Sequence, residues 1–373
     1  MEKRMKIIAF YLPQFHTFPE NDAWWGEGFT EWTSVKSAYP LFEGHKQPRV
    51  PLNKNYYDLT DVKTLEWQAK LAKKYGIYGF CYYHYWFDGH MLMEKPAELM
   101  LENKSVDLPF CMCWANEDWT KAWAKKSREV LISQTYADKE DWKKHFEYFL
   151  QFFKDDRYIK VDGKPLLILY RPEIIGPLKE MVTYWKELAR ENGFEDLCLV
   201  YQQADYDHTT AETGYLFDYA IEYQPALVKN HMQEKSLAWK WKRLKNKIMV
   251  QKLGMKQTKG NTITFDYDDA WKKILSIQPK DDKMLPGAFV DWDNTPRYKR
   301  GAHVYLGVTP KKFCHYLTKQ IKRAKEVYHK DMLFMFAWNE WGEGGYLEPD
   351  ETYGYGMLKA VRKALMDADE WEN

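Results

Sequence analysis

Short apolar runs alternate along the chain with longer amphipathic segments. The apolar runs are rich in β-branched and aromatic residues, which is typical of buried strands. Eight strands are predicted, at residues 6–12, 77–83, 109–114, 165–170, 197–201, 219–223, 287–290 and 332–337. Segments with a helical repeat lie between them, at residues 61–75, 95–102, 139–153, 178–192, 310–328 and 355–366.

This alternation of strands and helices favours a parallel sheet that is covered on both faces. An open, doubly wound sheet is the alternative, but no GxGxxG motif follows the first strand. We therefore predict an α/β protein, a (β/α)8 TIM barrel with long βα loops, in which residues 1–373 form a single domain. Residues 224–283 show no clear repeat and are predicted to be an irregular insertion.

The loop after the eighth predicted strand carries the sharpest candidate chemistry. The active site of a (β/α)8 barrel lies at the C-terminal ends of its strands, and Glu340 and Glu343 follow the last one, flanked by Trp338 and Trp341. Cleavage of a glycosidic bond needs one carboxylic acid and a second carboxylate, and burial raises a carboxyl pKa toward the range of a general acid. Gly342 and Gly344 are expected to provide unusual backbone angles. The alternative is a solvated acidic loop.

Polar residues follow the other predicted strands as well. His16, His84, Asn116 and Glu117 are candidates to hydrogen-bond sugar hydroxyls, with loop capping or the pairing of buried backbone groups as the alternative. Arg297 is a candidate to bind a carboxylate or sulfate on an acidic sugar.

Aromatic residues at the same strand ends are candidate platforms for stacking on sugar rings. Such rings offer an apolar face and a polar edge, as sugars do, although packing of the barrel rim would explain them too. The candidates are Tyr85, Trp86, Trp114, Trp292 and Trp341. Further candidate substrate-binding residues on this rim are Glu222, Asp293, Trp338 and Asn339.

The overall charge is balanced, with 55 Lys and Arg against 54 Asp and Glu. This balance gives no sign of a nucleic-acid partner, and the one basic run, at residues 240–247, is interpreted as a solvated helix face. His and acidic residues are dispersed, so neither a metal nor any other cofactor is expected. Aromatic residues make up 17% of the chain, which suits an oligosaccharide or polysaccharide as the partner.

The cysteines indicate a reducing compartment. There are five, an odd number, and no CxxC pair occurs, so we expect buried thiols in a cytoplasmic protein. No apolar run is long enough to span a bilayer, and no membrane insertion is expected.

The eighth loop also carries a family resemblance. Residues 338–344, with Leu347, Glu348 and Pro349 after them, resemble the Asn-Glu-Trp-x-Glu-Gly…Glu-Pro signature of glycoside hydrolase family 99. That family comprises endo-α-mannosidases and endo-α-mannanases with a (β/α)8 barrel. The match to these hydrolases is mostly confined to this loop.

Over nearly its whole length the chain is more similar to WbsX-type proteins. These occur in bacterial polysaccharide clusters and are commonly labelled glycosyltransferases with a family-99-like domain. The resemblance adds Trp25 and Glu31 to the candidate substrate-binding residues. The matching runs are residues 9–16, 25–32, 79–86, 113–117 and 292–297.

The resemblance to family 99 implies a mechanism and a substrate. Glu340 would deprotonate the 2-hydroxyl of the sugar, whose oxygen then attacks the anomeric carbon to give a 1,2-anhydro sugar. Glu343 would be the general acid and then the general base, and the two roles are interchangeable on sequence spacing. The expected reaction is retaining hydrolysis of α-linked, mannose-like bonds in a bacterial or host glycan.

Two other functions compete with this one. A glycosyltransferase of O-antigen or capsular polysaccharide biosynthesis could hold a metal–diphosphate on an Asp-x-Asp pair, and the sequence has three, at residues 205–207, 266–268 and 291–293. No Gly-rich phosphate loop accompanies them. A non-catalytic carbohydrate-binding protein would keep the aromatic residues without needing both glutamates.

Overall fold

Nine parallel strands form a nearly closed barrel in the computed structural model, which describes residues 4–120, 129–204, 208–210, 212–234, 262–298 and 301–371. The sheet order is β12-β10-β9-β8-β4-β2-β1-β15-β13. The (β/α)8 prediction is therefore confirmed. The barrel strands are β1 (Lys6–Tyr11), β2 (Ile77–Phe87), β4 (Phe110–Trp114), β8 (Lys164–Leu169), β9 (Cys198–Gln203), β10 (Tyr219–Glu222), β12 (Met284–Leu285), β13 (Gly287–Phe289) and β15 (Met332–Phe336).

The seventh barrel strand changes partner at Pro286. Its first part, β12, pairs with β10, and its second part, β13, pairs with β15. Proline has no N–H to donate to a sheet, but the Pro286 carbonyl accepts a hydrogen bond from the Phe334 N–H at 3.1 Å. Gly287 allows the close approach, because a Cβ there would lie 1.8 Å from the Glu222 carbonyl oxygen. This seam joins the two edges of the sheet and closes the barrel.

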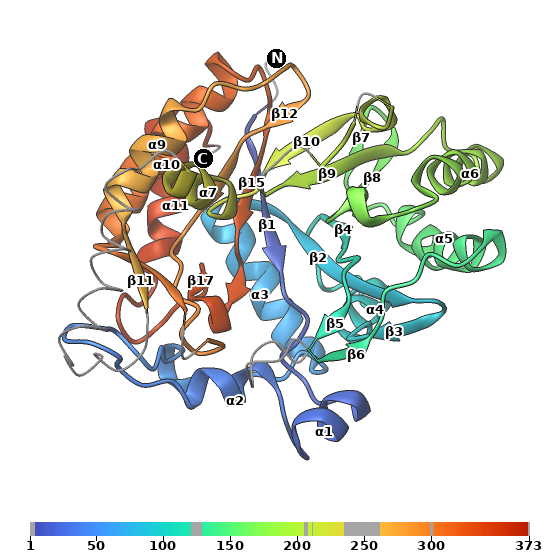
Figure 1. Ribbon diagram of the computed structural model, residues 1–373. Coiled ribbons are helices and arrows are strands. Elements are labelled where there is room, and N and C mark those ends of the chain that lie inside the picture. The colour runs from blue at the N-terminus through green and yellow to red at the C-terminus, as the bar shows by residue number, and fades with distance from the viewer. Residues whose placement is uncertain are drawn as a thin grey trace, which may run out of the picture.

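Helices cover the barrel at the six predicted positions, and α9 is an additional one. Figure 1 shows α9, α10 and α11 together on one flank and α5 and α6 on the opposite flank. Asp61 and Asp138 cap α3 and α5 with their side chains, and Gly76 ends α3 in a left-handed conformation. The helices around the barrel are α3 (Val62–Tyr75), α4 (Lys95–Glu102), α5 (Lys139–Phe153), α6 (Leu178–Glu191), α9 (Tyr267–Ser276), α10 (Pro310–Glu326) and α11 (Gly356–Asp367).

Short elements decorate the C-terminal ends of the strands. The arrow of β1 in Figure 1 points toward α2, β5 and β6, which mark that end of the barrel. The loop after β1 holds α1 (Pro19–Trp25), α2 (Glu31–Lys36) and η1 (Leu52–Lys54), and the loop after β15 holds β16 (Asn339–Glu340), η4 (Trp341–Glu343) and β17 (Gly345–Tyr346). The other short elements are β3 (His90–Leu92), β5 (Trp119–Thr120), β6 (Val130–Ile132), β7 (Lys160–Val161), η2 (Pro172–Ile174), η3 (Gly214–Leu216) and β14 (His303–Leu306).

The stretch at 224–283 is more regular than predicted. Its described part holds α7 (Ala226–Glu234), β11 (Ile263–Asp266) and α9. Trp271 of α9 is fully buried and stacks between Phe289 and Tyr316, with ring centroids 5.4 and 5.7 Å away. The prediction of an irregular insertion is therefore wrong for α9, whose apolar positions 267, 271 and 274 follow a helical repeat over only ten residues. The basic run at 240–247 lies outside the described residues.

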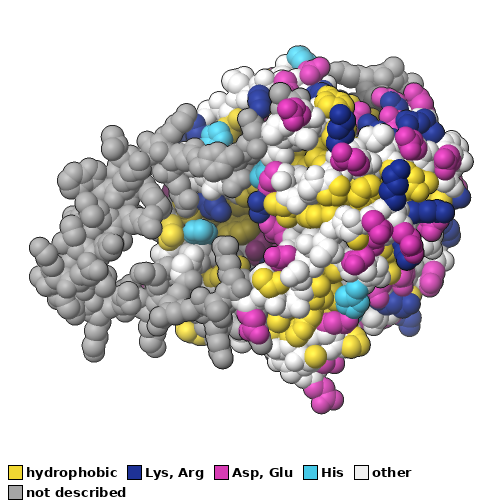
Figure 2. All heavy atoms as spheres, turned by 45° about the vertical axis from the view of Figure 1, so that its right-hand side comes forward, with side chains coloured by type: hydrophobic (Ala, Val, Ile, Leu, Met, Phe, Trp, Pro, Cys, Tyr) yellow, Lys and Arg dark blue, Asp and Glu magenta, His cyan; other side chains and the backbone are white. Residues whose placement is uncertain are grey.

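The surface and interior agree with the composition. All five cysteines are free and buried. The face shown in Figure 2 carries acidic and basic side chains interspersed with one another. Within the described ranges, no helix has both the length and the apolar character needed to cross a bilayer.

Candidate active site

The hairpin after β15 turns Glu340 and Glu343 to the same side. Residues three apart on a 3₁₀ turn project together, and η4 joins the antiparallel pair β16 and β17. Gly344 ends the turn with φ 66°, as expected of a glycine in the left-handed region. Gly342 serves a different purpose from the one predicted. A Cβ on Gly342 would lie 1.7 Å from Glu31 Oε1, so its missing side chain makes room for that carboxylate.

One guanidinium holds three glutamates behind this hairpin. Arg297 Nε donates to Glu31 Oε1 at 2.7 Å, Nη2 donates to Glu340 Oε2 at 3.1 Å, and Nη1 lies 3.1 Å from Glu343 Oε1. Glu31 is fully buried, whereas the Glu343 side chain keeps 17% of its surface exposed. Arg297 was predicted to bind a carboxylate or sulfate on an acidic sugar, and in the structure its guanidinium is engaged by the protein's own carboxylates.

The cluster has too little positive charge for three ionised carboxylates. Burial raises the pKa of Glu340 to about 8, with Arg297 opposing the rise and the charges of Glu343 and Glu31 adding to it. Burial also raises the pKa of Glu343, again against Arg297. Carboxyls with pKa values moved toward neutrality in a cavity are typical of acid–base catalysis.

The two glutamates open into a pocket of about 270 Å³. Five tyrosines line it, and two of them are in contact, with Tyr83 Oη 3.0 Å from Tyr223 Oη. Tyr85, Glu117 and Arg297 were predicted site residues, and the pocket brings them together with Glu340 and Glu343. The full lining is Leu12, Gln14, Tyr83, Tyr85, Ala115, Glu117, Asp118, Trp119, Thr120, Tyr170, Tyr223, Arg297, Tyr298, Glu340 and Glu343.

Several pocket residues were missed by the sequence analysis. Tyr83 lies two residues before Tyr85 on β2 and therefore faces the same side of the strand, so the two-residue repeat would have indicated it. Gln14 is 1% exposed, lines the pocket, and has a buried Nε2 without a hydrogen-bond partner among the described residues. Tyr170, Tyr223 and Trp119 come from three different loops, and no local pattern relates them.

His84, Trp86 and Trp114 point away from the pocket, so their predicted role in substrate binding is corrected. His84 Nε2 lies 3.0 Å from His145 Nε2 on α5, and burial lowers the pKa of His84 to about 3. Trp86 donates to Asp141 at 3.0 Å and stacks on His145 at 4.4 Å. Trp114 packs edge-on against the same ring. These three side chains join the barrel wall to α5.

Two asparagines act as backbone clamps between strand ends. Asn116 donates to the Arg171 carbonyl and accepts from the Arg171 N–H, both at 2.8 Å. Asn339 does the same with Leu12, at 2.9 and 2.8 Å. Both are fully buried, so the prediction that they contact substrate is replaced by a role in positioning loops.

Trp338 and Trp341 are fully buried and are not stacking platforms. Trp338 packs on Phe80 at 4.9 Å. Trp341 stacks on Tyr346 at 3.7 Å and donates its Nε1 hydrogen to Glu348 at 2.7 Å. These contacts hold the hairpin after β15 against the barrel.

Glu348 anchors that hairpin with a buried carboxylate. Tyr57 Oη and Gln68 Nε2 each donate to it at 2.7 Å, in addition to Trp341. Burial nevertheless raises the pKa of Glu348 to about 7, although these donors favour the ionised form.

Four further candidates lie outside the pocket lining. Glu222 is buried and accepts from Tyr328 Oη at 2.9 Å, and burial raises its pKa to about 7. His16 is buried beside the Thr17 carbonyl. Trp25 stacks on Phe29, and Trp292 packs on Phe336. The structure does not bring these four to the glutamates.

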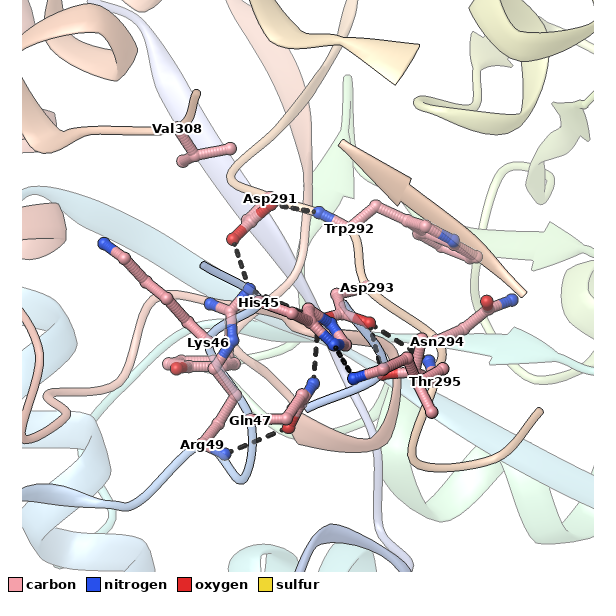
Figure 3. Close-up of polar contacts among 12 residues, drawn as sticks. His45, Lys46, Gln47, Arg49, Asp291, Trp292, Asp293, Asn294, Thr295 and Val308 are labelled. Atoms are coloured by element: carbon pink, nitrogen blue, oxygen red, sulfur yellow. Dashed lines mark hydrogen bonds and ion pairs between the residues drawn. The ribbon is translucent and has the colours of Figure 1, made fainter. Parts of the chain in front are cut away.

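Asp293 belongs to a buried polar network beside the hairpin (Figure 3). The Leu41 N–H donates to His45 Nδ1, so His45 carries its proton on Nε2 and donates it to Asp293 at 2.8 Å. Gln47 also donates to Asp293 at 2.8 Å. The Asp293 N–H donates to the Glu343 carbonyl at 2.6 Å. Asp293 is thus a positioning residue, which corrects its predicted contact with substrate.

The remaining Asp-x-Asp pairs are also occupied. Asp291 accepts from Arg49 at 2.9 Å, Asp266 caps α9, and Asp268 accepts from Lys312 at 2.6 Å. Residues 205–207 lie outside the described chain. Within the described ranges, no group of three His, Cys, Asp or Glu side chains is placed to hold a metal ion.

Comparison with known sequences relates the chain to one family over most of its length. A family model described as "Glycosyltransferase WbsX" matches residues 7–361. "Uncharacterized protein WxcX" of Xanthomonas campestris pv. campestris strain B100 is 35% identical over 366 residues, which are 98% of this chain and 50% of that protein. The WxcX protein of strain ATCC 33913 matches equally. The chain therefore spans about half the length of these curated relatives.

Comparison with solved structures supports the fold. A family 99 endo-α-mannosidase from Bacteroides thetaiotaomicron superposes with a TM-score of 0.54 at 13% identity, covering 98% of this chain and 96% of that one. A structure described as a glycoside hydrolase-like protein gives a TM-score of 0.56 at 13% identity, covering 97% and 94%. At these identities the likeness establishes the barrel alone.

Proposed function

The chain belongs to the WbsX glycosyltransferase family, and from that premise and the geometry of its pocket we propose that it is a retaining glycosidase for α-linked, mannose-like bonds of a polysaccharide. The observation that carries the proposal is the placement of Glu340 and Glu343 on one guanidinium, facing a cavity, with both carboxyl pKa values raised. The family 99 fold of the solved relatives and the shared eighth-loop signature support the same chemistry.

The exposure of the two glutamates suggests their roles. The Glu343 side chain is 17% exposed and the Glu340 side chain 6%. The general acid exchanges a proton with the leaving group and then with water, so the more exposed Glu343 suits it. Glu340, deeper and with a raised pKa, is a stronger base than an ordinary glutamate once it is deprotonated.

The proposed reaction has two steps. Glu340 takes the proton of the 2-hydroxyl, O2 attacks the anomeric carbon, and the glycosidic bond breaks as Glu343 protonates the departing oxygen. Glu343 then deprotonates a water molecule that attacks the anomeric carbon, and the proton on Glu340 returns to O2. Two inversions at that carbon give overall retention.

The rest of the pocket provides groups for binding a sugar. Tyr85 and Trp119 meet edge to face at 5.3 Å and offer aromatic surface at the rim. Gln14 Nε2 is a donor without a partner in the described part of the chain, and Glu117 is an acceptor at the opening, held by Arg171 at 2.6 Å. We assign Gln14 and Glu117 to sugar hydroxyls.

The test is incubation of wild type, Glu340→Gln and Glu343→Gln with a panel of α-linked oligosaccharides and no nucleotide sugar, with products read by mass spectrometry. We expect wild type to cleave mannose-containing substrates and each variant to lose about 10²–10⁴-fold in rate. An aryl glycoside with a good leaving group needs little acid assistance, so it should restore the first step in Glu343→Gln but not in Glu340→Gln.

The family description makes sugar transfer the second candidate. Product formation only after addition of a nucleotide sugar would refute the glycosidase and establish a transferase. Oligosaccharide binding by wild type with no turnover under either condition would instead establish a binding protein.

A further inference from the structure

A groove of about 620 Å³ runs between α10 and α11 on the outer wall of the barrel. Its floor contains small or apolar side chains, including Cys314 and Ala360. Its walls carry His315 and a single acid, Asp367. The lysines that line it are Lys311, Lys319, Lys322, Lys359 and Lys363.

Most of this positive charge has no counterion within the described chain. Lys363 is 2.9 Å from Asp367, but no ion pair engages the other four lysines of the groove among the described residues. Lys312 on the inner side of α10 is different, since Asp268 holds it at 2.6 Å. On the face of Figure 2, by contrast, acids and bases alternate.

The two helices add to the positive electrostatic potential of the groove. Both run antiparallel to the barrel strands, so their N-termini lie at the end of the barrel that carries the glutamates. Pro310 and Gly356, the first residues of α10 and α11, line that end of the groove. The N-terminus of a helix carries a partial positive charge, and here two such ends are adjacent.

Hydrogen bonds connect the loop before α10 to the loop that holds His45 and Gln47. Lys46 Nζ donates to Tyr353 Oη at 2.9 Å, and Tyr353 Oη donates to the Val308 carbonyl at 2.8 Å, two residues before α10. Figure 3 shows Lys46 and Val308 beside the network of His45 and Asp293. Lys46 is exposed, so one further cation lies near the start of α10, outside the groove lining.

The shape favours an extended polymer over a flat surface. Lys311 and Lys322 are eleven positions apart, which is about 16 Å along a helix, and the lysines line a concavity rather than protrude from a plane. We infer that this groove binds an anionic stretch of a linear glycan, one that carries carboxylate or phosphate groups. The identification of the polymer as a glycan rests on the proposed function, whereas the selection for negative charge does not.

The test compares binding of polygalacturonate, neutral mannan and vesicles of phosphatidylglycerol and phosphatidylcholine to the whole protein at low and moderate salt. The groove variant is Lys319→Gln with Lys322→Gln and Lys359→Gln. The control removes three exposed lysines elsewhere, Lys143→Gln with Lys179→Gln and Lys272→Gln. Circular dichroism confirms that both are folded.

We expect the groove variant to bind polygalacturonate at least tenfold more weakly than wild type and with less dependence on salt. The control should stay within twofold of wild type, and mannan binding should not respond to the groove substitutions. Equal polygalacturonate binding by wild type and the groove variant, no binding by wild type, or a groove-dependent preference for vesicles would each overturn the inference.

Failure of this inference can be told apart from failure of the glycosidase. The double variant Glu340→Gln with Glu343→Gln should bind polygalacturonate as wild type does, because the groove and the pocket share no residues. Charge-selective binding without any turnover would leave the groove intact and refute only the glycosidase.

Discussion

Two buried carboxylate clusters lie next to each other at the end of the barrel and differ in how their charge is balanced. Around Arg297, one cation serves Glu31, Glu340 and Glu343. Four residues earlier, Asp293 accepts four hydrogen bonds, from His45, Gln47 and the N–H and hydroxyl of Thr295. Both clusters are buried, so burial does not distinguish them.

The pKa values follow this difference. Burial opposes ionisation of Asp293, but the hydrogen bond from His45 and the charge of Arg49 hold its pKa below the usual value. Asp291, with Arg49 and one backbone N–H, keeps a pKa that burial has raised. Glu340 and Glu343 share a single cation and also stay raised. A buried carboxylate with many donors belongs to the framework, and one with few donors that faces a cavity is available for proton transfer.

Removal of the shared cation is expected to have the largest effect. Arg297→Met leaves three carboxylates without a positive partner, and we expect a loss of about 3–5 kcal/mol in the free energy of unfolding and at least a hundredfold loss of kcat/KM. Urea unfolding and steady-state kinetics measure these effects. Arg171→Met is the matched control, because Arg171 is 37% exposed, and it should cost less than about 1 kcal/mol.

Adding Glu31→Gln to Arg297→Met should recover part of the stability and none of the activity. Full stability and turnover in Arg297→Met alone would show that the cluster does not depend on the guanidinium.

The raised carboxyl pKa values predict the pH dependence of turnover. A reaction that needs one glutamate protonated and the other ionised gives a bell-shaped profile of kcat/KM. Since the pKa of Glu340 is raised from 4.5 to about 8 and that of Glu343 is also raised, the maximum should lie near neutrality. Two unperturbed glutamates would place it near pH 4.5. The profile of Glu348→Gln should keep both limbs, which excludes Glu348 as their source.

Asp293→Asn tests the framework cluster. We expect a loss of about 1–3 kcal/mol in the free energy of unfolding, with a smaller effect on turnover. Because the folded-state pKa of Asp293 is lowered from 3.8, its contribution is present above that pH and is lost as the pH falls below it. Wild type and variant should therefore converge in stability at acid pH. A difference that persists there would mean that Asp293 acts through packing alone.

The smallest effect is expected at Gln14. Gln14→Ala should raise KM about fivefold, the value of one hydrogen bond worth about 1 kcal/mol, while kcat and stability change little. Asn116→Ala provides the contrast, since Asn116 clamps two strand ends and should lower stability instead. A fall in stability without a change in KM for Gln14→Ala would remove Gln14 from the binding site.

The barrel and its strand ends could be predicted because apolar runs and helical repeats are local. The direction of individual side chains was harder to predict. Tyr85 lines the pocket, but His84 and Trp86 were selected with it although successive residues of a strand face opposite sides. Counting by two from Tyr85 would have rejected both and found Tyr83.

The charge cluster could not be derived from any local pattern. Glu31 and Arg297 are 266 residues apart, and only the closed barrel places them together behind Gly342. The family resemblance indicated Glu31 without its role. The ion pairs of Arg297 could not be predicted for the same reason, because its partners come from loops distant in sequence.

The change of strand partner at Pro286 has a consequence for the folding of the protein. The strand that contains Pro286 joins the middle of the chain, through β10, to the last barrel strand, β15. Arg297 follows that seam directly, while its three partners come from the first and last loops of the barrel. Neither the N-terminal nor the C-terminal half of the chain therefore contains all four residues of the charge cluster. Neither half can assemble the cluster alone. Catalytic competence should consequently appear during refolding only with the final, slow, long-range closure, so regained turnover would report completion of folding more faithfully than regained helix content.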